Sequence, residues 1–103
     1  MSEKSYLYLI SDGTNVKVGV SKNPHRRIKQ LQTGSSNKLE MLECYCLPAD
    51  KVYKLEKVCH ARLQSRYRKH GEWFKAPNVW DLTCTVEMEL EGYIIEDWEA
   101  NRN

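Results

Sequence analysis

Two short segments near the N-terminus, separated by a turn signal, constrain the fold more than any other feature. Tyr6–Ile10 is a run of aromatic and aliphatic residues, and Asn15–Val20 alternates apolar with other residues at a period of two. Asp12-Gly13 between them is typical of a tight turn. We therefore expect a β-hairpin, with Lys17 and Gly19 facing away from the core. The residues of the second segment that face the core are Val16, Val18 and Val20.

Two helices and a third strand are expected to follow this hairpin. Ser21–Pro24 offers a polar N-cap and then proline at the first helical position, which predicts a short basic helix over Pro24–Thr33. Leu39–Leu47 has the composition of a strand. Asp50 can cap a long helix that extends to about Lys69. Its apolar residues follow the i, i+3, i+4 rule: Val52, Leu55, Cys59 and Leu63.

These elements predict an α/β fold in which a small three-stranded, mainly antiparallel sheet is flanked by helices. A length of 103 residues suits one domain. We assign residues 1–78 to the main domain, in which Glu72-Trp73-Phe74 packs back on the sheet. Residues 79–103 are expected to form an acidic helix, packed on the same domain or extending it. Its apolar residues occur at helical spacing: Val79, Leu82, Val86, Leu90, Ile94 and Trp98.

The charge is distributed unevenly along the chain. Residues 13–78 contain 14 Lys and Arg against five Asp and Glu, whereas residues 79–103 contain seven acids and a single arginine. Residues 14–39 contain no acid, which favours a polyanionic partner such as nucleic acid over a merely solvated surface. The acidic C-terminal helix could fold over a basic cleft. Alternatively, Val86, Leu90 and Ile94 could mediate a homodimer or bind a partner protein.

The hydropathy and the N-terminus indicate a cytoplasmic protein without a membrane partner. No run approaches the roughly 20 apolar residues of a membrane span, and the N-terminus lacks the apolar region of a signal peptide. The four cysteines are therefore expected to be reduced and mostly buried. A zinc site of Cys44, Cys46, Cys59 and His60 is disfavoured, because residues i and i+2 of a strand stand farther apart than paired zinc ligands on a turn.

Glu56 is the most informative single residue. Its helical position places a carboxylate at the edge of the apolar stripe, with His60 one turn later on the same face. A carboxylate there needs compensation, which an ion pair with Lys or Arg would supply. The alternative is a metal ligand or an acid/base group at the margin of a cleft.

Two further sets of residues are candidates for chemistry. In the first helix, Arg26 and Arg27 lie beside His25 and Lys29, so a guanidinium could bind a phosphate or simply belong to a solvated basic face. In the first strand, Tyr8 shares a face with Tyr6. Strand aromatics usually pack, but a tyrosine hydroxyl at a strand end can also orient water or transfer a proton.

The order of these residues resembles that of the GIY-YIG nuclease superfamily. The resemblance spans Tyr6 to Phe74 and rests on Tyr8 with Ile10, Val16-Lys17-Val18-Gly19, Asn23-Pro24 with Arg27, and Glu56. It is strongest to short phage and bacterial domains whose second motif begins with lysine, as Lys17 does here. Those domains also resemble this chain at Leu31-Gln32-Thr33-Gly34 and at Gly71-Glu72-Trp73-Phe74.

The resemblance implies a role for each residue. Glu56 would hold Mg²⁺ or Mn²⁺, Arg27 would neutralise charge on the phosphate in the transition state, and Tyr8 would position or deprotonate the attacking water. Gly19 would allow close approach of a phosphate. Lys17 stands where the family has a second tyrosine, and is expected to contact phosphate rather than act as a base.

The general base is left among three candidates: Tyr8, then His25, then His60. We expect a metal-dependent endonuclease that hydrolyses DNA, with RNA as a further substrate class. The alternative is a catalytically inactive protein that keeps the fold and binds nucleic acid or inhibits another protein. Residues expected to follow the nucleic-acid backbone are Lys17, Gly19, Lys22, Arg26, Lys29 and Lys38.

Overall fold

The centre of the molecule is an antiparallel sheet. The computed structural model describes residues 4–93 and 96–97. The three long strands are β1 (Lys4–Ser11), β2 (Asn15–Ser21) and β3 (Glu40–Pro48), and β1 pairs antiparallel with both of the others. The predicted hairpin of β1 and β2 and the third strand are confirmed.

The turn of this hairpin is closed by one side chain. The Asp12 carboxylate accepts hydrogen bonds from the backbone N–H groups of Thr14 (2.9 Å) and Asn15 (2.7 Å). Gly13 adopts φ +102°, in the left-handed region that favours glycine. Asp12-Gly13 is therefore a local cause of the hairpin.

Three short strands enlarge the sheet beyond the three strands expected. They are β4 (Lys69–His70), β5 (Trp73–Lys75) and β6 (Glu96–Asp97), and the order across the sheet is β4-β5-β2-β1-β3-β6. Every pairing is antiparallel, so the predicted fold class is confirmed. β5 is the aromatic segment that was expected to pack back on the sheet. Strands of two or three residues are too short to show a period in the sequence.

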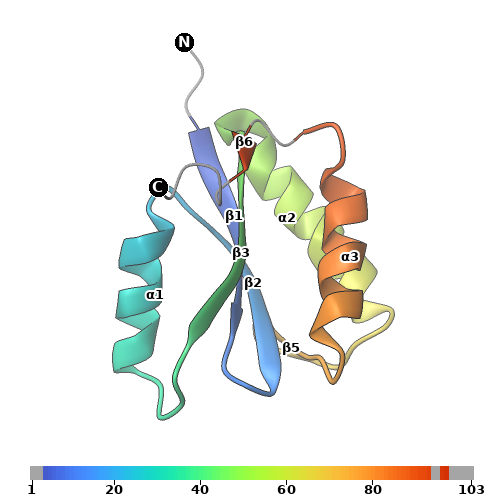
Figure 1. Cartoon of the computed structure of the whole chain (residues 1–103). Helices are drawn as coiled ribbons and strands as arrows, with labels where there is room; N and C mark the ends of the chain where they lie inside the picture. The colour runs from blue at the N-terminus through green and yellow to red at the C-terminus, as the bar shows by residue number, and fades with distance from the viewer. Residues whose placement is uncertain (1–3, 94–95, 98–103) are drawn as a thin grey trace.

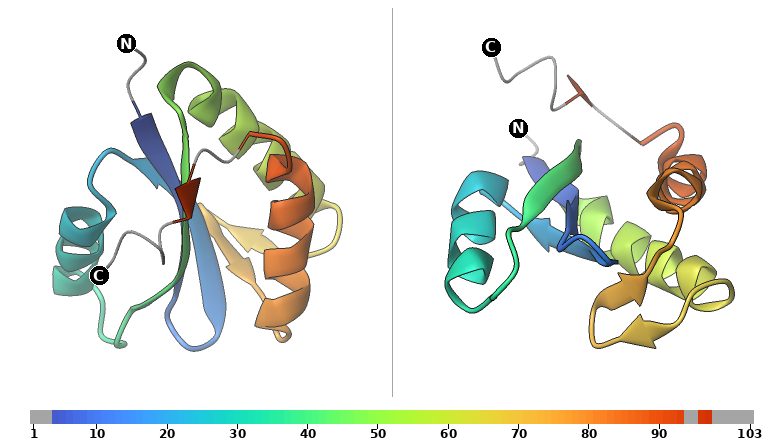
Figure 2. Two further views of the ribbon diagram at one scale, coloured as in Figure 1. Left: turned by 45° about the horizontal axis from the view of Figure 1, so that its top comes forward. Right: turned by 60° about the horizontal axis from the view of Figure 1, so that its bottom comes forward.

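Helices cover both faces of the sheet. α1 (Pro24–Thr33) lies on one face, and α2 (Ala49–Gln64) lies on the other together with α3 (Val79–Leu90) (Figure 1). Figure 2 shows the same division from two further directions. The bounds of α1 are those predicted, and the Asn23 side chain accepts a hydrogen bond from the Arg26 N–H at 3.1 Å.

Two buried clusters follow from this arrangement, because alternate side chains of each strand point to opposite faces. The larger cluster lies under α2 and α3 and includes Leu7, Leu9, Val16, Val18, Val52, Leu55, Cys59, Leu63, Leu82, Val86 and Leu90. The smaller lies under α1 and contains Tyr8, Ile10, Leu39 and Cys44, with Ile28 and Leu31 of α1 packed against it. The apolar stripe predicted for the second helix is confirmed.

The ends of α2 differ from the prediction. The helix stops at Gln64 rather than near Lys69, and Lys69 belongs instead to β4. The residue at the N-cap is Pro48, which makes no side-chain cap, whereas Asp50 lies within the first turn. A carboxylate in the first turn still favours the helix through the macrodipole, which is why Asp50 suggested a helix start.

The C-terminal helix is also shorter than expected. α3 ends at Leu90, Gly92 adopts φ +90°, and Glu96–Asp97 pairs with β3. Val86 and Leu90 are fully buried in the larger cluster, so the prediction that they form an exposed docking stripe was wrong. The other predicted positions, Ile94 and Trp98, lie outside the described residues.

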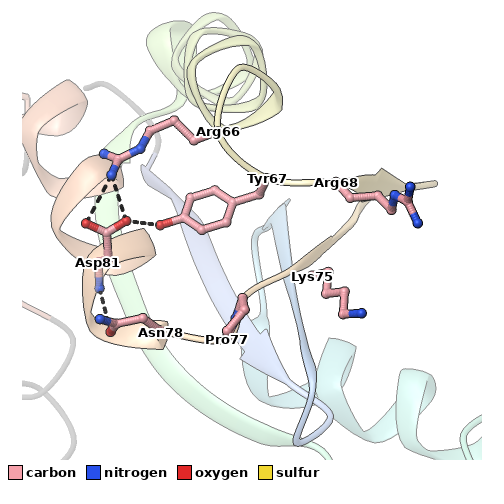
Figure 3. A pocket seen from close by; sticks show the side chains of 7 residues that line it. All are labelled: Arg66, Tyr67, Arg68, Lys75, Pro77, Asn78 and Asp81. Atoms are coloured by element: carbon pink, nitrogen blue, oxygen red, sulfur yellow. Dashed lines mark hydrogen bonds and ion pairs between the residues drawn. The ribbon is translucent and has the colours of Figure 1, made fainter.

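The acids of α3 contact neighbouring elements, and Asp81 also lines a hollow with Arg66, Arg68 and Lys75. Asp81 pairs with Arg66 at 3.0 Å and accepts a hydrogen bond from the Tyr67 hydroxyl (Figure 3). Glu89 pairs with Arg62 of α2 at 3.1 Å. The expectation that the acidic segment folds over the nucleic-acid site stays a prediction.

The cysteines are free, as expected. Cys44, Cys46 and Cys59 are buried and Cys84 is partly exposed. Within the described ranges, no helix has both the length and the apolar character that a membrane crossing requires.

Candidate active site

The site is built around a contact between Tyr8 of β1 and Gly19 of β2. These residues are directly opposite each other across the two strands. A Cβ added to Gly19 would lie 2.4 Å from the Oη and 2.6 Å from the Cζ of Tyr8, so the tyrosine ring lies over the glycine. The space at Gly19 is therefore filled by Tyr8, which corrects the expectation that it leaves room for a phosphate.

Arg27 approaches the same tyrosine from α1. Its side chain is partly buried, unlike that of its exposed neighbour Arg26. Burial raises the pKa of Tyr8, and a hydrogen bond from Arg27 together with its positive charge offsets only part of that rise. The Tyr8 phenol therefore keeps its proton at neutral pH. Helical phase explains the difference between the two arginines, because Arg27 adjoins Ile28 on the side of α1 that faces the sheet.

Glu56 enters from α2 on the opposite face of the sheet. Burial raises the pKa of its carboxyl group, and electrostatic interactions with His60, Lys17 and Lys69 counteract the rise. In residues 4–93, no side chain forms a hydrogen bond or an ion pair with this carboxylate. It lines a hollow of about 260 Å³ together with His60, Lys69 and Glu72. Of the two alternatives for Glu56, the ion pair is not formed.

His60 contacts the open edge of β2. β5 pairs with β2 only as far as Lys17, and the next carbonyl group, that of Val18, lies 2.8 Å from His60 Nε2. A carbonyl oxygen only accepts hydrogen bonds, so Nε2 carries a proton and Nδ1 of the neutral ring keeps its lone pair. The ring also makes an edge contact with Phe74, at 5.2 Å between centroids. These contacts fix the position and the tautomer of His60.

Lys17 is not available at the surface. Its side chain faces the α1 side of the sheet, is 6% exposed, and forms an ion pair with Glu72. Its Nζ lies 5.8 Å from the centroid of Trp73. The structure thus gives this ammonium group a partner other than phosphate. Glu72 was not selected as a site residue from sequence, although a lysine in a buried strand requires a nearby carboxylate.

The charges of these groups act on one another. Tyr8 is influenced by Arg27, Glu72 and Glu56, and the pKa of Glu72 is lowered first by its hydrogen bond with Lys17 and further by His60 and Arg27. Tyr8 therefore interacts electrostatically with both Arg27 and Glu56, although Glu56 comes from the other face of the sheet.

The remaining predicted residues lie farther out. His25 is exposed at the start of α1 and is not among the main groups whose charges shift the pKa of Tyr8 or Glu56. Exposed basic residues assigned to nucleic-acid binding are Lys22, Arg26, Lys29 and Lys38. No group of three or more His, Cys, Asp or Glu side chains in the described residues is arranged to hold a metal, which also applies to the zinc site considered above.

Together, these features define a small α/β domain in which a phenol interacts electrostatically with a guanidinium and a carboxylate, and in which basic side chains are exposed along α1. The model of the T5orf172 domain family matches residues 5–90, and the chain belongs to this family. It is a phage-associated domain found in a nuclease-related context, which suggests a nuclease-like or DNA-binding role. No curated protein and no solved structure matches the chain. Membership of the GIY-YIG superfamily stays a prediction.

Proposed function

We propose that this protein is a metal-dependent endonuclease of the GIY-YIG type that hydrolyses phosphodiester bonds of DNA. The observation that carries the proposal is that Tyr8 receives a hydrogen bond from Arg27 and interacts electrostatically with Glu56. The three residues come from β1, α1 and α2, so these interactions depend on the tertiary fold. Exposed lysines and arginines of α1 would contact the flanking phosphates.

The carboxylate of Glu56 suits a hard divalent cation. It is partly desolvated, makes no hydrogen bond or ion pair with another described residue, and opens into a hollow. A single carboxylate fits Mg²⁺ or Mn²⁺, because such an ion keeps several waters and needs few protein ligands. When bound, the cation would supply Lewis acidity toward the phosphate and stabilise the leaving oxygen.

The other side chains would orient and neutralise the reacting groups. Arg27 would donate hydrogen bonds to the phosphate as its negative charge grows in the transition state. The protonated Tyr8 phenol would donate a hydrogen bond to the attacking water or to a phosphate oxygen. The contact with Gly19 holds the phenol in place before substrate arrives.

His60 is the better candidate for the general base. The raised pKa of Tyr8 disfavours its phenolate, whereas in a neutral His60 ring the donation from Nε2 to Val18 leaves a lone pair on Nδ1. His60 and Glu56 line the same hollow, so a water beside the carboxylate would lie near the imidazole. This reverses the order of preference expected from the sequence, in which Tyr8 came first.

A plasmid-nicking assay with matched variants tests the proposal. We expect Mg²⁺- or Mn²⁺-dependent nicking by the wild type and a much lower nicking rate in Glu56→Gln. Arg27→Ala should slow cleavage by roughly 10²–10³-fold, as for removal of one preorganised transition-state donor. Glu40→Gln and Arg62→Ala, which change exposed residues of the same types outside the proposed site, are the controls. Cleavage that is absent on DNA and RNA, or that is equal in Glu56→Gln and Glu40→Gln, would contradict the proposal.

A second candidate function is nucleic-acid binding without catalysis. One observation favours it: Lys17 takes the place of a second tyrosine and is buried in an ion pair with Glu72. A metal-independent affinity for DNA, combined with no nicking under any tested metal, would select this alternative.

A further inference from the structure

A second hollow lies on the α1 side of the sheet, next to the candidate site. It has a volume of about 810 Å³ and extends between the C-terminal end of α1, with Gly34 and Ser35 beyond it, and the β4–β5 hairpin. The hairpin contributes four side chains, which we call the basic hairpin face: Arg68, His70, Trp73 and Lys75. None of the four was assigned a function from the sequence.

The register of the hairpin explains why these four side chains share one face. His70 is opposite Trp73, and the Lys75 N–H donates to the Arg68 carbonyl at 2.9 Å, so Arg68 is opposite Lys75. Side chains at such paired positions project to the same side of a sheet. Lys69 and Phe74, the pair between them, point to the other face.

The stability of the fold does not explain why Arg68 and Lys75 face each other. Like charges directly opposite each other across two strands are destabilising. In residues 4–93 neither side chain forms an ion pair with a carboxylate, and both are exposed. Both side chains also line a neighbouring hollow with Asp81, but Figure 3 shows the Asp81 carboxylate bound to Arg66 and Tyr67 instead. The hollow on the α1 side also contains Asp12, but its carboxylate accepts hydrogen bonds from the N–H groups of its own turn. The paired cations therefore suit an anionic ligand.

Trp73 adds an aromatic surface to this cationic one. Its ring is partly exposed and lines the hollow, while Lys17 covers part of it from 5.8 Å. Trp73 is in register with Lys17, and Lys17 is two residues from Gly19 on the same face of β2. Two residues of a strand span roughly 7 Å, at about 3.3 Å per residue. Along β2, the hollow therefore lies within roughly 7 Å of the contact between Tyr8 and Gly19.

We propose that this hollow binds a single-stranded segment of nucleic acid that leads to the candidate site. Arg68 and Lys75 contact its phosphates, and Trp73 stacks on one unpaired base. Stacking requires a base that is free of its partner, so the face selects single strands over duplex. This inference rests on the proposed function, because the bound strand leads toward the proposed cleavage site. Binding of the strand itself requires no catalysis.

Fluorescence anisotropy with labelled oligonucleotides tests the inference. The full chain is titrated into a single-stranded oligonucleotide and into the duplex of the same sequence, with EDTA present so that no cleavage occurs. We expect Trp73→Leu to weaken single-strand binding roughly 5- to 150-fold, the range for loss of one base–aromatic contact. Trp73→Phe keeps an aromatic ring and should retain most of the affinity. Trp80→Leu, at a tryptophan 75% exposed on α3, should have no effect.

Salt dependence tests the phosphate contacts. Arg68→Gln and Lys75→Gln should each reduce the slope of log affinity against log salt concentration by about 0.7 for a single strand. Lys51→Gln and Lys54→Gln, on the exposed side of α2, should not change it. These surface variants also decide the matter if Trp73→Leu does not fold.

The two proposals fail in different ways. Equal single-strand affinities of Trp73→Leu and Trp80→Leu would contradict single-strand binding in the hollow. A wild type that prefers duplex would contradict it as well. Neither result would bear on nicking by the wild type. If Trp73→Leu loses single-strand affinity and the wild type does not nick DNA, single-strand binding in the hollow would be supported and the hydrolytic function contradicted.

Discussion

A methyl group added at Gly19 would collide with Tyr8, and its cost can be worked out from the structure. The new Cβ would lie 2.4 Å from the Tyr8 Oη, whereas carbon and oxygen atoms in contact need about 3.5 Å. The tyrosine tip must therefore move by about 1 Å. A flexible side chain could move cheaply, but Tyr8 is 2% exposed and packed in the cluster under α1.

The expected loss of stability follows from two opposing effects. Overpacking a buried site costs about 1–3 kcal/mol. Replacing glycine by alanine in a strand returns roughly 0.5–1 kcal/mol through the lower entropy of the unfolded chain. We predict that Gly19→Ala lowers the free energy of unfolding by about 1–2 kcal/mol, which is roughly 4–16 °C in Tm for a domain of this size.

Urea denaturation followed by circular dichroism measures this change. Gly34→Ala is the control. A Cβ added to Gly34 would lie 3.9 Å from its nearest neighbour, the Leu31 carbonyl oxygen, and the φ of Gly34 is −98°, which alanine adopts readily. In a Tyr8→Leu background, which removes the colliding atoms, Gly19→Ala should cost about 1–2 kcal/mol less. A stability within about 0.5 kcal/mol of wild type, or an equal cost in both backgrounds, would refute the reasoning.

Two further predictions concern titratable groups. The hydrogen bond from Lys17 lowers the pKa of Glu72, so this carboxylate stabilises the fold above its unfolded pKa of about 4.5, and the contribution is lost as the pH falls through the lowered folded value. Acid titration of unfolding should therefore destabilise the wild type more steeply than Glu72→Gln, and parallel curves would contradict this. Burial raises the pKa of Cys44 and of Cys59 to about 12, so Cys84 should react first with a thiol reagent in the native protein. Rapid modification that persists in Cys84→Ser would show otherwise.

Local sequence signals predicted most of the fold. The Asp12-Gly13 turn, the alternation in β2 and the cap of α1 each act within a few residues, so they are visible in the sequence. The ends of α2 and α3 were missed for a different reason. Lys69 and Glu96 join strands because tertiary pairing with β5 and β3 outweighs helical periodicity, and such pairing has no local signature.

The candidate site was predictable only in part. Helical phase marked Glu56 as unusual without any knowledge of the fold. The partners of Lys17 were not visible, because Glu72 is 55 residues away and reaches Lys17 through a two-strand hairpin. The structural role of Gly19 could not be predicted either, because it depends on which residue of β1 lies opposite Gly19 in the hairpin.

The most direct test of the central claim is the single-turnover cleavage rate of the Arg27→Ala, Glu56→Gln double variant. Residues that act as one unit have strongly non-additive effects on the rate. If Tyr8, Arg27 and Glu56 form one phosphodiester-cleaving site, the double variant should cleave about as slowly as the worse of the two single variants. A rate reduced by the product of the two single effects would mean that the residues act independently, and would contradict the account.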